Sequence, residues 1–266
     1  MNTPPLFIDG VAFWAPGLPG WDVARAAFRS EAELVQPPAP RPTPVLLAPV
    51  QRRRAPDTVT LALEVASGAV AQAGLVASDL PSVFVSAHGD LAINDSMCKT
   101  LAEAPTLVSP TRFHNSVHNA ASGYWTMATG CTQASTALTA FEHSFAAGLL
   151  EAATQCTADE RAVLLVGYDV EACGALRSVT RSRGMVAGAL VLSPERSARS
   201  VASVAWSLVP GPATACALRS EAARSLAHNA MVGAVPVFEA LASQQPETLS
   251  MPLSALLSLN LRIEPL

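Results

Sequence analysis

Charged residues are scarce in this chain: 14% of its 266 residues are Asp, Glu, Lys or Arg, and the formal net charge is −4. That balance gives no electrostatic reason to expect a nucleic-acid partner, because binding to phosphates needs a basic surface. Half of the residues are hydrophobic, and the mean hydropathy is +0.31. This is apolar for a soluble monomer, so we expect the excess apolar surface to lie at a subunit interface.

Several other features are absent from the sequence. No run of about 18 apolar residues lacks a polar interruption, so we expect no membrane-spanning helix. The opening MNTPPLFIDG has no basic region followed by an apolar core, and nothing else indicates secretion. The five cysteines include no CxxC pair, which favours reduced thiols and a cytoplasmic location. His114 and His118 have no carboxylate or thiol nearby at ligand spacing, so we expect neither a metal nor a cofactor.

Apolar segments alternate with helical ones along most of the chain, which predicts an α/β fold with a sheet covered on both faces. Six prolines between Pro37 and Pro49 predict an extended surface connection. Too few residues precede that connection to form a domain, so we expect one domain over residues 1–266. We expect strands at 6–13, 83–86, 135–140, 162–167, 185–193, 201–208 and 256–263. We expect helices at 21–30, 57–73, with Asp57 as N-cap, and at 91–101, 143–154, 214–227 and 235–242.

The stretch from Ser109 to Glu151 is the most informative part of the sequence. It predicts a small-residue helix, a strand at 135–140, a sharp turn at residues 141–143 and a second small-residue helix. Enzymes use a strand, a tight turn and a helix to hold a nucleophile at the helix N-terminus, where the N–H groups and the dipole favour an anion. The residue at the tip here is Glu142. A carboxylate is stabilised by the dipole at such a position whatever its role.

Four segments of this sequence resemble the β-ketoacyl synthase family of the thiolase-like fold. SPTRFHNSVHNAASGYWTMATG is similar to the family's Ser-Pro opening and its helix, and STALTA with Glu142 and His-Ser is similar to the elbow that presents the catalytic cysteine. VLLVGYDVE and GMVAGALVLSPE resemble the two strands that follow. The resemblance covers roughly residues 6–208, which leaves 209–266 as a shortened remnant. It implies an α/β, thiolase-like, layered α-β-α-β-α fold with a truncated second half.

Two departures from the family pattern bear on activity. Glu142 stands where the family has its nucleophilic cysteine, and a carboxylate cannot form a thioester. The two histidine-bearing loops of the family's second half are missing: the only histidine after the turn is His228, in SLAHNAMVG, which resembles neither loop. We therefore expect no imidazole there to stabilise an enolate, and no catalytic residue in this chain. The family includes chain length factors, which replace the cysteine, and this chain is most similar to the short ones of aryl-polyene pathways.

The resemblance implies a role for each segment of a non-condensing subunit. The strand at 135–140 would pair across a dimer axis, the loop at 112–116 would reach the partner's pocket, and the helix at 91–101 would line a tunnel. Ile93, Met97 and Leu101 share one helix face, which is equally the pattern of an ordinary core. The implied tunnel and interface residues are Ile93, Met97, Leu101, Arg112, Phe113, His114, Asn115, Ser116, Ser135, Thr136, Ala137, Leu138, Thr139, Ala140, Phe141 and Glu142.

The implied partners are an active ketosynthase subunit, in a heterodimer, and indirectly an acyl carrier protein. The three arginines at 52–54 are either a solvated helix start or a contact for such an acidic partner. Two other functions stay open. One is a malonyl-decarboxylating or acyl-transfer enzyme that uses Glu142, and the other is a stand-alone acyl-binding module or homodimer.

Overall fold

A single mixed sheet of nine strands runs through the computed structural model, which describes residues 4–180, 182–214 and 216–266. Its order is β4-β3-β5-β6-β1-β7-β9-β8, and the short β2 pairs with β1. The strands are β1 (Leu6–Ala15), β2 (Leu18–Pro19), β3 (Ser82–Val85), β4 (Ser135–Leu138), β5 (Val163–Asp169), β6 (Val186–Ser193), β7 (Ala202–Pro210), β8 (Glu247–Ser254) and β9 (Leu257–Pro265). The pairings β3–β4 and β3–β5 are parallel, and the others are antiparallel.

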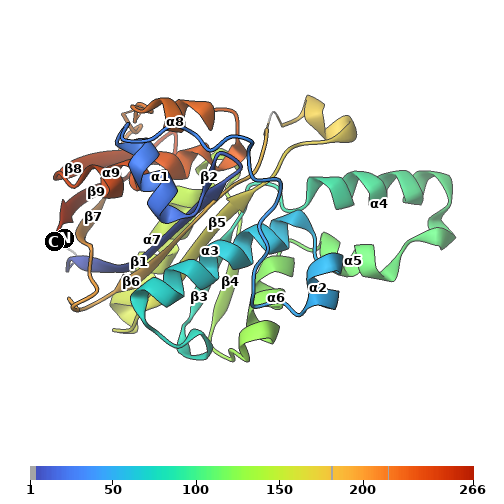
Figure 1. Cartoon of the computed structure of the whole chain (residues 1–266), viewed down its shortest axis with the longest axis horizontal. Helices are drawn as coiled ribbons and strands as arrows, with labels where there is room; N and C mark the ends of the chain where they lie inside the picture. Colours follow the sequence, from blue (N-terminus) through green and yellow to red (C-terminus); the bar gives the residue numbers. More distant parts are fainter. Residues whose placement is uncertain (1–3, 181, 215) are drawn as a thin grey trace.

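Helices cover both faces of this sheet (Figure 1). The α-helices are α1 (Trp21–Phe28), α2 (Pro49–Arg54), α3 (Asp57–Ala73), α4 (Leu91–Glu103), α5 (Pro110–Ser116), α6 (Ala120–Thr129), α7 (Ser144–Ala158), α8 (Glu221–Ser225) and α9 (Val235–Ser243). The short 3₁₀ turns are η1 (Ala77–Asp79), η2 (Pro105–Leu107), η3 (Phe141–His143), η4 (Gly174–Ser178) and η5 (Ala230–Ala234). Among the described residues, no helix is both long and apolar enough to cross a membrane.

The two faces of the sheet carry separate hydrophobic cores. On one face α3 and α6 pack with alternate residues of β1, β5 and β6. On the other face α1, α7 and α9 pack with the intervening residues. Every residue of β5 and β6 is buried, as the near-continuous apolar runs predict for strands covered on both sides. The helix α3 ends at Gly74, whose φ of 66° is left-handed.

Close packing between α3 and β1 depends on Gly10. A Cβ at that position would overlap the carbonyl oxygen of Ala69 in α3. Only a residue without a side chain therefore allows the helix backbone to approach the strand this closely. The contact fixes how α3 lies on the sheet.

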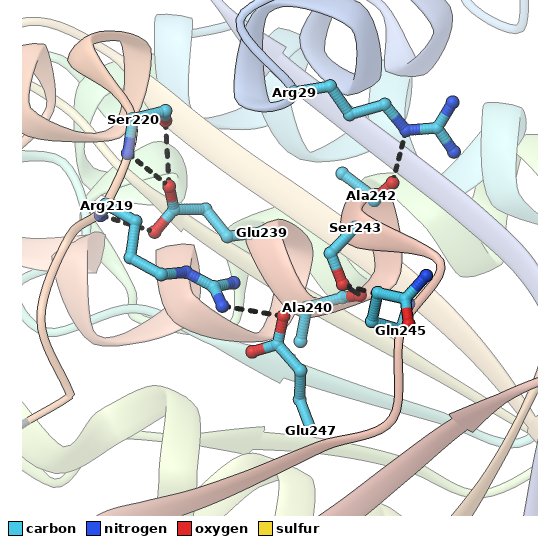
Figure 2. A network of polar contacts seen from close by, with 9 residues as sticks. All are labelled: Arg29, Arg219, Ser220, Glu239, Ala240, Ala242, Ser243, Gln245 and Glu247. Atoms are coloured by element: carbon cyan, nitrogen blue, oxygen red, sulfur yellow. Dashed lines mark hydrogen bonds and ion pairs between the residues drawn. The ribbon is translucent and has the colours of Figure 1, made fainter.

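The shortened C-terminal part adds β8 and β9 to the same sheet rather than building a second one, since β9 pairs along the whole of β7. A polar network holds this part together (Figure 2). The buried Glu239 carboxylate on α9 accepts hydrogen bonds from the Arg219 amide (3.1 Å), the Ser220 amide (2.9 Å) and the Ser220 hydroxyl (2.8 Å). The Arg219 guanidinium also pairs with Glu247 of β8 at 2.6 Å. The network joins α9, β8 and the segment before α8.

The predicted α/β organisation is confirmed, and the structure corrects several local expectations. The helix expected at 214–227 is wrong: residue 215 lies outside the described residues, and of the rest only α8 is helical. Backbone amides of Arg219 and Ser220 bind Glu239, and the Ser220 side chain then caps α8 by accepting from the Ala223 amide at 3.0 Å. The helix therefore begins only at Glu221.

The N-cap expected at Asp57 is also wrong. The N-cap of α3 is Pro56, without a side-chain hydrogen bond, and Asp57 is the first helical residue. The Asp57 carboxylate pairs instead with Arg41 at 2.9 Å. The arginines at 52–54 belong to a separate helix, α2, which the sequence did not predict.

Candidate functional site

The turn between β4 and α7 has the form of an elbow. β4 ends at Leu138, and the 3₁₀ turn η3 leads directly into α7. Phe141 adopts a left-handed backbone with φ of 57°. The Ser144 hydroxyl fixes this conformation, because it accepts a hydrogen bond from the Ala140 amide (2.9 Å) and donates one to the Phe141 carbonyl (2.6 Å). Thr139 anchors the turn to the segment after β3 by donating to the Ala87 carbonyl at 3.1 Å.

The turn presents its first two side chains to solvent. Phe141 is 66% exposed, and the side chain of Glu142 is 82% exposed. The Glu142 carboxylate lies 3.8 Å from Nε2 of His143, the third residue of the turn. Ser144 is buried beneath them. On this chain Glu142 is thus a solvated carboxylate at the start of α7, the position where a helix dipole favours negative charge.

A cavity of about 290 Å³ lies beside the turn. Four segments of the chain line it: the segment after β3, the turn itself, and two later segments near residues 180 and 230. Glu142 shares it with the imidazoles of His88 and His228. The His88 ring meets the Phe141 ring edge to face, with centroids 5.3 Å apart. Burial lowers the pKa of His88, which favours its neutral form.

The presence of His228 corrects the expectation that no histidine from the second half would reach the turn. Its neighbour Asn229 is buried, and the Asn229 side-chain amide donates to the carbonyls of Arg183 (2.9 Å) and Gly184 (3.2 Å). The Asn229 side-chain oxygen accepts from the Met231 amide at 2.9 Å. These bonds hold the segment against the ends of β5 and β6. The local sequence SLAHNAMVG does not predict the position of His228, because that position depends on contacts between distant segments.

A buried carboxylate, Asp169, holds the segment that carries His88. It lies at the end of β5, is 1% exposed, and accepts hydrogen bonds from the Ser86 hydroxyl (2.7 Å) and the Ala87 amide (2.9 Å). Burial raises the pKa of Asp169 to about 6, although these hydrogen bonds oppose the rise. The carboxyl group that holds the His88 segment therefore takes up a proton more readily than an ordinary aspartate.

The described residues bring one carboxylate (Glu142), two imidazoles (His88 and His228) and two hydroxyls (Thr180 and Ser182) to the cavity beside the turn. Among the described residues that line the cavity there is no cysteine. Carboxylates and imidazoles can hold or move protons, but neither forms the thioester that acyl transfer to a thiol requires. The cavity thus has acid–base groups without a thiol nucleophile.

The predicted interface strand lies at the end of the sheet. Among the described strands, β4 pairs only with β3. It comprises Ser135, Thr136, Ala137 and Leu138, while Thr139 and Ala140 fall outside it. The carbonyls of Ala134 and Leu138 accept from the amide of Ser82 in β3 (3.0 Å) and from that of Ser86, directly after β3 (3.4 Å). The backbone groups of the alternate residues, Ser135 and Ala137, therefore point away from β3. A strand with such an open edge can pair with a second chain.

The segment expected as a loop at 112–116 is helical, which corrects that expectation. Ser109 caps α5 and Pro110 occupies its first position, both of which favour a helix start. Arg112, Phe113 and His114 are exposed and Ser116 is partly buried. Asn115, in contrast, is buried and accepts a hydrogen bond from the Tyr124 hydroxyl at 3.1 Å. Asn115 therefore contacts its own chain rather than projecting outward.

The helix α4 extends outward, away from the sheet (Figure 1). Along its predicted apolar face Ile93 is partly buried, Met97 is 8% exposed and Leu101 is 54% exposed. The face is therefore a core contact at its middle and open at its outer end. Its assignment to a tunnel wall stays a prediction.

Comparisons with known proteins agree with this architecture. The model for "Beta-ketoacyl synthase, N-terminal domain" matches residues 26–252, whereas no curated protein sequence matches significantly. A structure of a ketosynthase (ApeO) in complex with its chain length factor (ApeC) from Xenorhabdus doucetiae matches at 21% identity and a TM-score of 0.73, covering 98% of this chain and 99% of that one. The ishigamide ketosynthase/chain length factor matches at 13% identity and a TM-score of 0.73, covering 99% of each chain. A β-ketoacyl synthase from Burkholderia phymatum matches at 11% identity and a TM-score of 0.72, covering 100% of each chain. The sheet and its helices match the thiolase-like ketosynthase fold, and the chain belongs to the family of the β-ketoacyl synthase N-terminal domain.

Proposed function

We propose that this chain is a non-condensing chain length factor that forms a heterodimer with an active β-ketoacyl-acyl carrier protein synthase. In that complex it shapes the tunnel that holds the growing chain, in aryl-polyene or polyketide biosynthesis. It works in the cytoplasm as one thiolase-like domain over residues 1–266, and it meets the acyl carrier protein only through the complex. Two of its structural neighbours are described as ketosynthases with chain length factors, which supports this assignment.

The observation that carries the proposal is the absence of a thiol at the elbow. The turn presents Phe141, Glu142 and His143, and its cavity has no cysteine among the described lining residues. Condensation needs a thiolate to take the acyl chain before the new carbon–carbon bond forms. Loss of a nucleophile removes orders of magnitude of rate even where the rest of a site is retained. A subunit with this turn would depend on a partner for condensation.

A partner is also supported by an exposed apolar surface on α4, η2 and α5. Large apolar side chains are exposed to solvent on α4, η2, α5 and the residue after α5. They are Leu101 (54% exposed), Leu107 (74%), Phe113 (61%) and Val117 (46%). Exposed apolar groups of this size on neighbouring segments are typical of an interaction surface. Together with the open edge of β4, they offer both main-chain pairing and apolar burial to a second subunit.

The test is co-expression with a full-length ketosynthase from the same genome, followed by light scattering and a condensation assay. We expect a 1:1 complex whose condensing activity requires the partner's own cysteine. Ala137→Pro should abolish the complex, because it removes an outward-pointing amide of β4 without touching the bonds to β3. Ala137→Val keeps that amide and is the matched control. A well-behaved chain that condenses alone would contradict the proposal.

A second function, decarboxylation of a malonyl group, has one observation in its favour. Glu142, His88 and His228 line the same cavity, and imidazoles can stabilise the charge that develops on an enolate. The assay follows conversion of malonyl to acetyl carrier protein by the isolated chain. Under the chain length factor proposal the chain is inert. Turnover that is lost in both Glu142→Gln and His228→Ala would instead establish the enzyme.

A further inference from the structure

Phe141 differs from the other non-glycine residues with positive φ in its position relative to the helices and strands. In the described part of the chain, the others are Ser30, Glu160 and Gln244. Each of these three follows the end of a helix (α1, α7 or α9), where a left-handed residue commonly terminates the hydrogen bonding. Phe141 instead precedes a helix and follows a strand, and a bulky residue rarely adopts this conformation. Its backbone strain therefore needs another explanation.

The Ser144 hydroxyl maintains this strain by binding the groups on both sides of it, the Ala140 amide and the Phe141 carbonyl. Strained backbone that the surroundings enforce is typical of functional turns. In nucleophile elbows the residue with the strained backbone, at the sharp strand-to-helix turn, is the one that presents the reactive group. By that criterion the presenting residue is Phe141. Glu142, one residue later, does not have a positive φ.

We infer that Phe141, rather than Glu142, occupies the nucleophile's position in this elbow, and that its ring fills the space beside His88 that an acylated thiol would need. The ring lines the cavity and meets the His88 ring edge to face, with centroids 5.3 Å apart. Glu142 directs its carboxylate toward His143, its immediate neighbour, at 3.8 Å. The assignment moves the substituted position by one residue from the expectation based on sequence. It deepens the proposed function by naming the side chain that excludes a thioester-borne acyl group.

The inference can be tested on the isolated chain by placing a thiol at each position. Phe141→Cys and Glu142→Cys are alkylated with iodoacetamide between pH 5 and pH 9, and peptide mass spectrometry separates the new thiol from the five native ones. Both variants also carry His143→Ala, because the side chain at position 142 lies beside that imidazole. A thiol beside an imidazole and a helix N-terminus has a lowered pKa, so we expect the thiol at position 141, which lies beside His88, to react about tenfold faster at pH 6. His88→Ala in the Phe141→Cys background should remove that advantage. Equal rates, or a faster thiol at 142, would overturn the inference.

A second measurement does not depend on thiol chemistry. Phe141→Gly should raise the melting temperature of the chain, because glycine adopts a left-handed backbone without strain and the exposed ring contributes little burial. Glu142→Gly, the matched control, should lower it. A lower melting temperature for Phe141→Gly than for Glu142→Gly would contradict the assignment. If these tests fail while the heterodimer still forms, only this inference falls and the proposed function stands.

Discussion

Replacement of Asp169 by asparagine should change how stability depends on pH. The pKa of Asp169 rises from its ordinary value of 3.8 to about 6, mainly because burial disfavours the charged carboxylate. A group whose pKa is raised in the folded state stabilises the fold fully below its unfolded pKa. That contribution is lost as the pH rises through the folded pKa. Between pH 4 and pH 7 the wild type should lose roughly 2 kcal/mol from this group, because the unfolded carboxyl is already partly ionised at pH 4.

Asparagine is a fair isostere for this test, written Asp169→Asn, because its side-chain oxygen can still accept from the Ala87 amide and its amide nitrogen can donate to the Ser86 oxygen. The Asp169 side chain is 1% exposed, so little solvent screening reduces the effect. Urea unfolding of both proteins at pH 4, 5.5 and 7 gives the difference in unfolding free energy at each pH. We expect the free energy of unfolding of the variant to rise relative to that of the wild type as the pH rises. A difference that stays constant with pH would refute the reasoning.

Three further changes have defined outcomes. Glu239→Ala leaves the Arg219 amide, the buried Ser220 amide and the Ser220 hydroxyl without an acceptor. Urea unfolding should therefore show a loss of about 3 kcal/mol or more, with Glu239→Gln intermediate; equal losses would count against the network. Gly10→Ala places a Cβ on the Ala69 carbonyl and should lower the free energy of unfolding by about 1–3 kcal/mol. Its control, Gly123→Ala on α6, meets nothing within 4 Å and should be neutral or stabilising. A Gly10→Ala protein as stable as the wild type would contradict the close contact. Phe113→Ser should change the free energy of unfolding of the isolated chain by no more than about 0.5 kcal/mol, because the ring is exposed. The same change should weaken the heterodimer in a pull-down. Unchanged binding would exclude Phe113 from the interface.

Features that depend on the local sequence could be predicted, whereas features that depend on contacts between distant segments could not. β5 and β6 are continuous apolar runs because both of their faces are buried, and that pattern is visible without a structure. β8 was missed because its sequence, ETLSMPLS, is half exposed and contains a proline, and its strand conformation depends on pairing with β9. The same limit applied to α8, whose start is set by the buried Glu239.

The candidate site divides in the same way. The strand, turn and helix around Glu142 were predicted from residue pattern, and the structure contains that turn. The left-handed backbone of Phe141 could not be read from the sequence, because a hydroxyl three residues later imposes it. His228 was missed because its place in the cavity depends on hydrogen bonds from Asn229 to segments more than 40 residues away.

The two ends of the sheet differ in a way that bears on the partner. At one end β8 carries Pro252, a charged Glu247 and an irregular register between Pro252 and Ser254, and each of these discourages pairing with another strand. At the other end β4 has the sequence STAL, with no charge, no proline and a continuous register against β3. A protein that protects one edge and leaves the other unprotected would aggregate through the second unless something covers it. In the proposed heterodimer a strand of the partner covers β4. An isolated chain should therefore self-associate through this edge, and Ala137→Pro should keep it monomeric. An isolated wild-type chain that stays monomeric at high concentration would remove this support for a partner at β4.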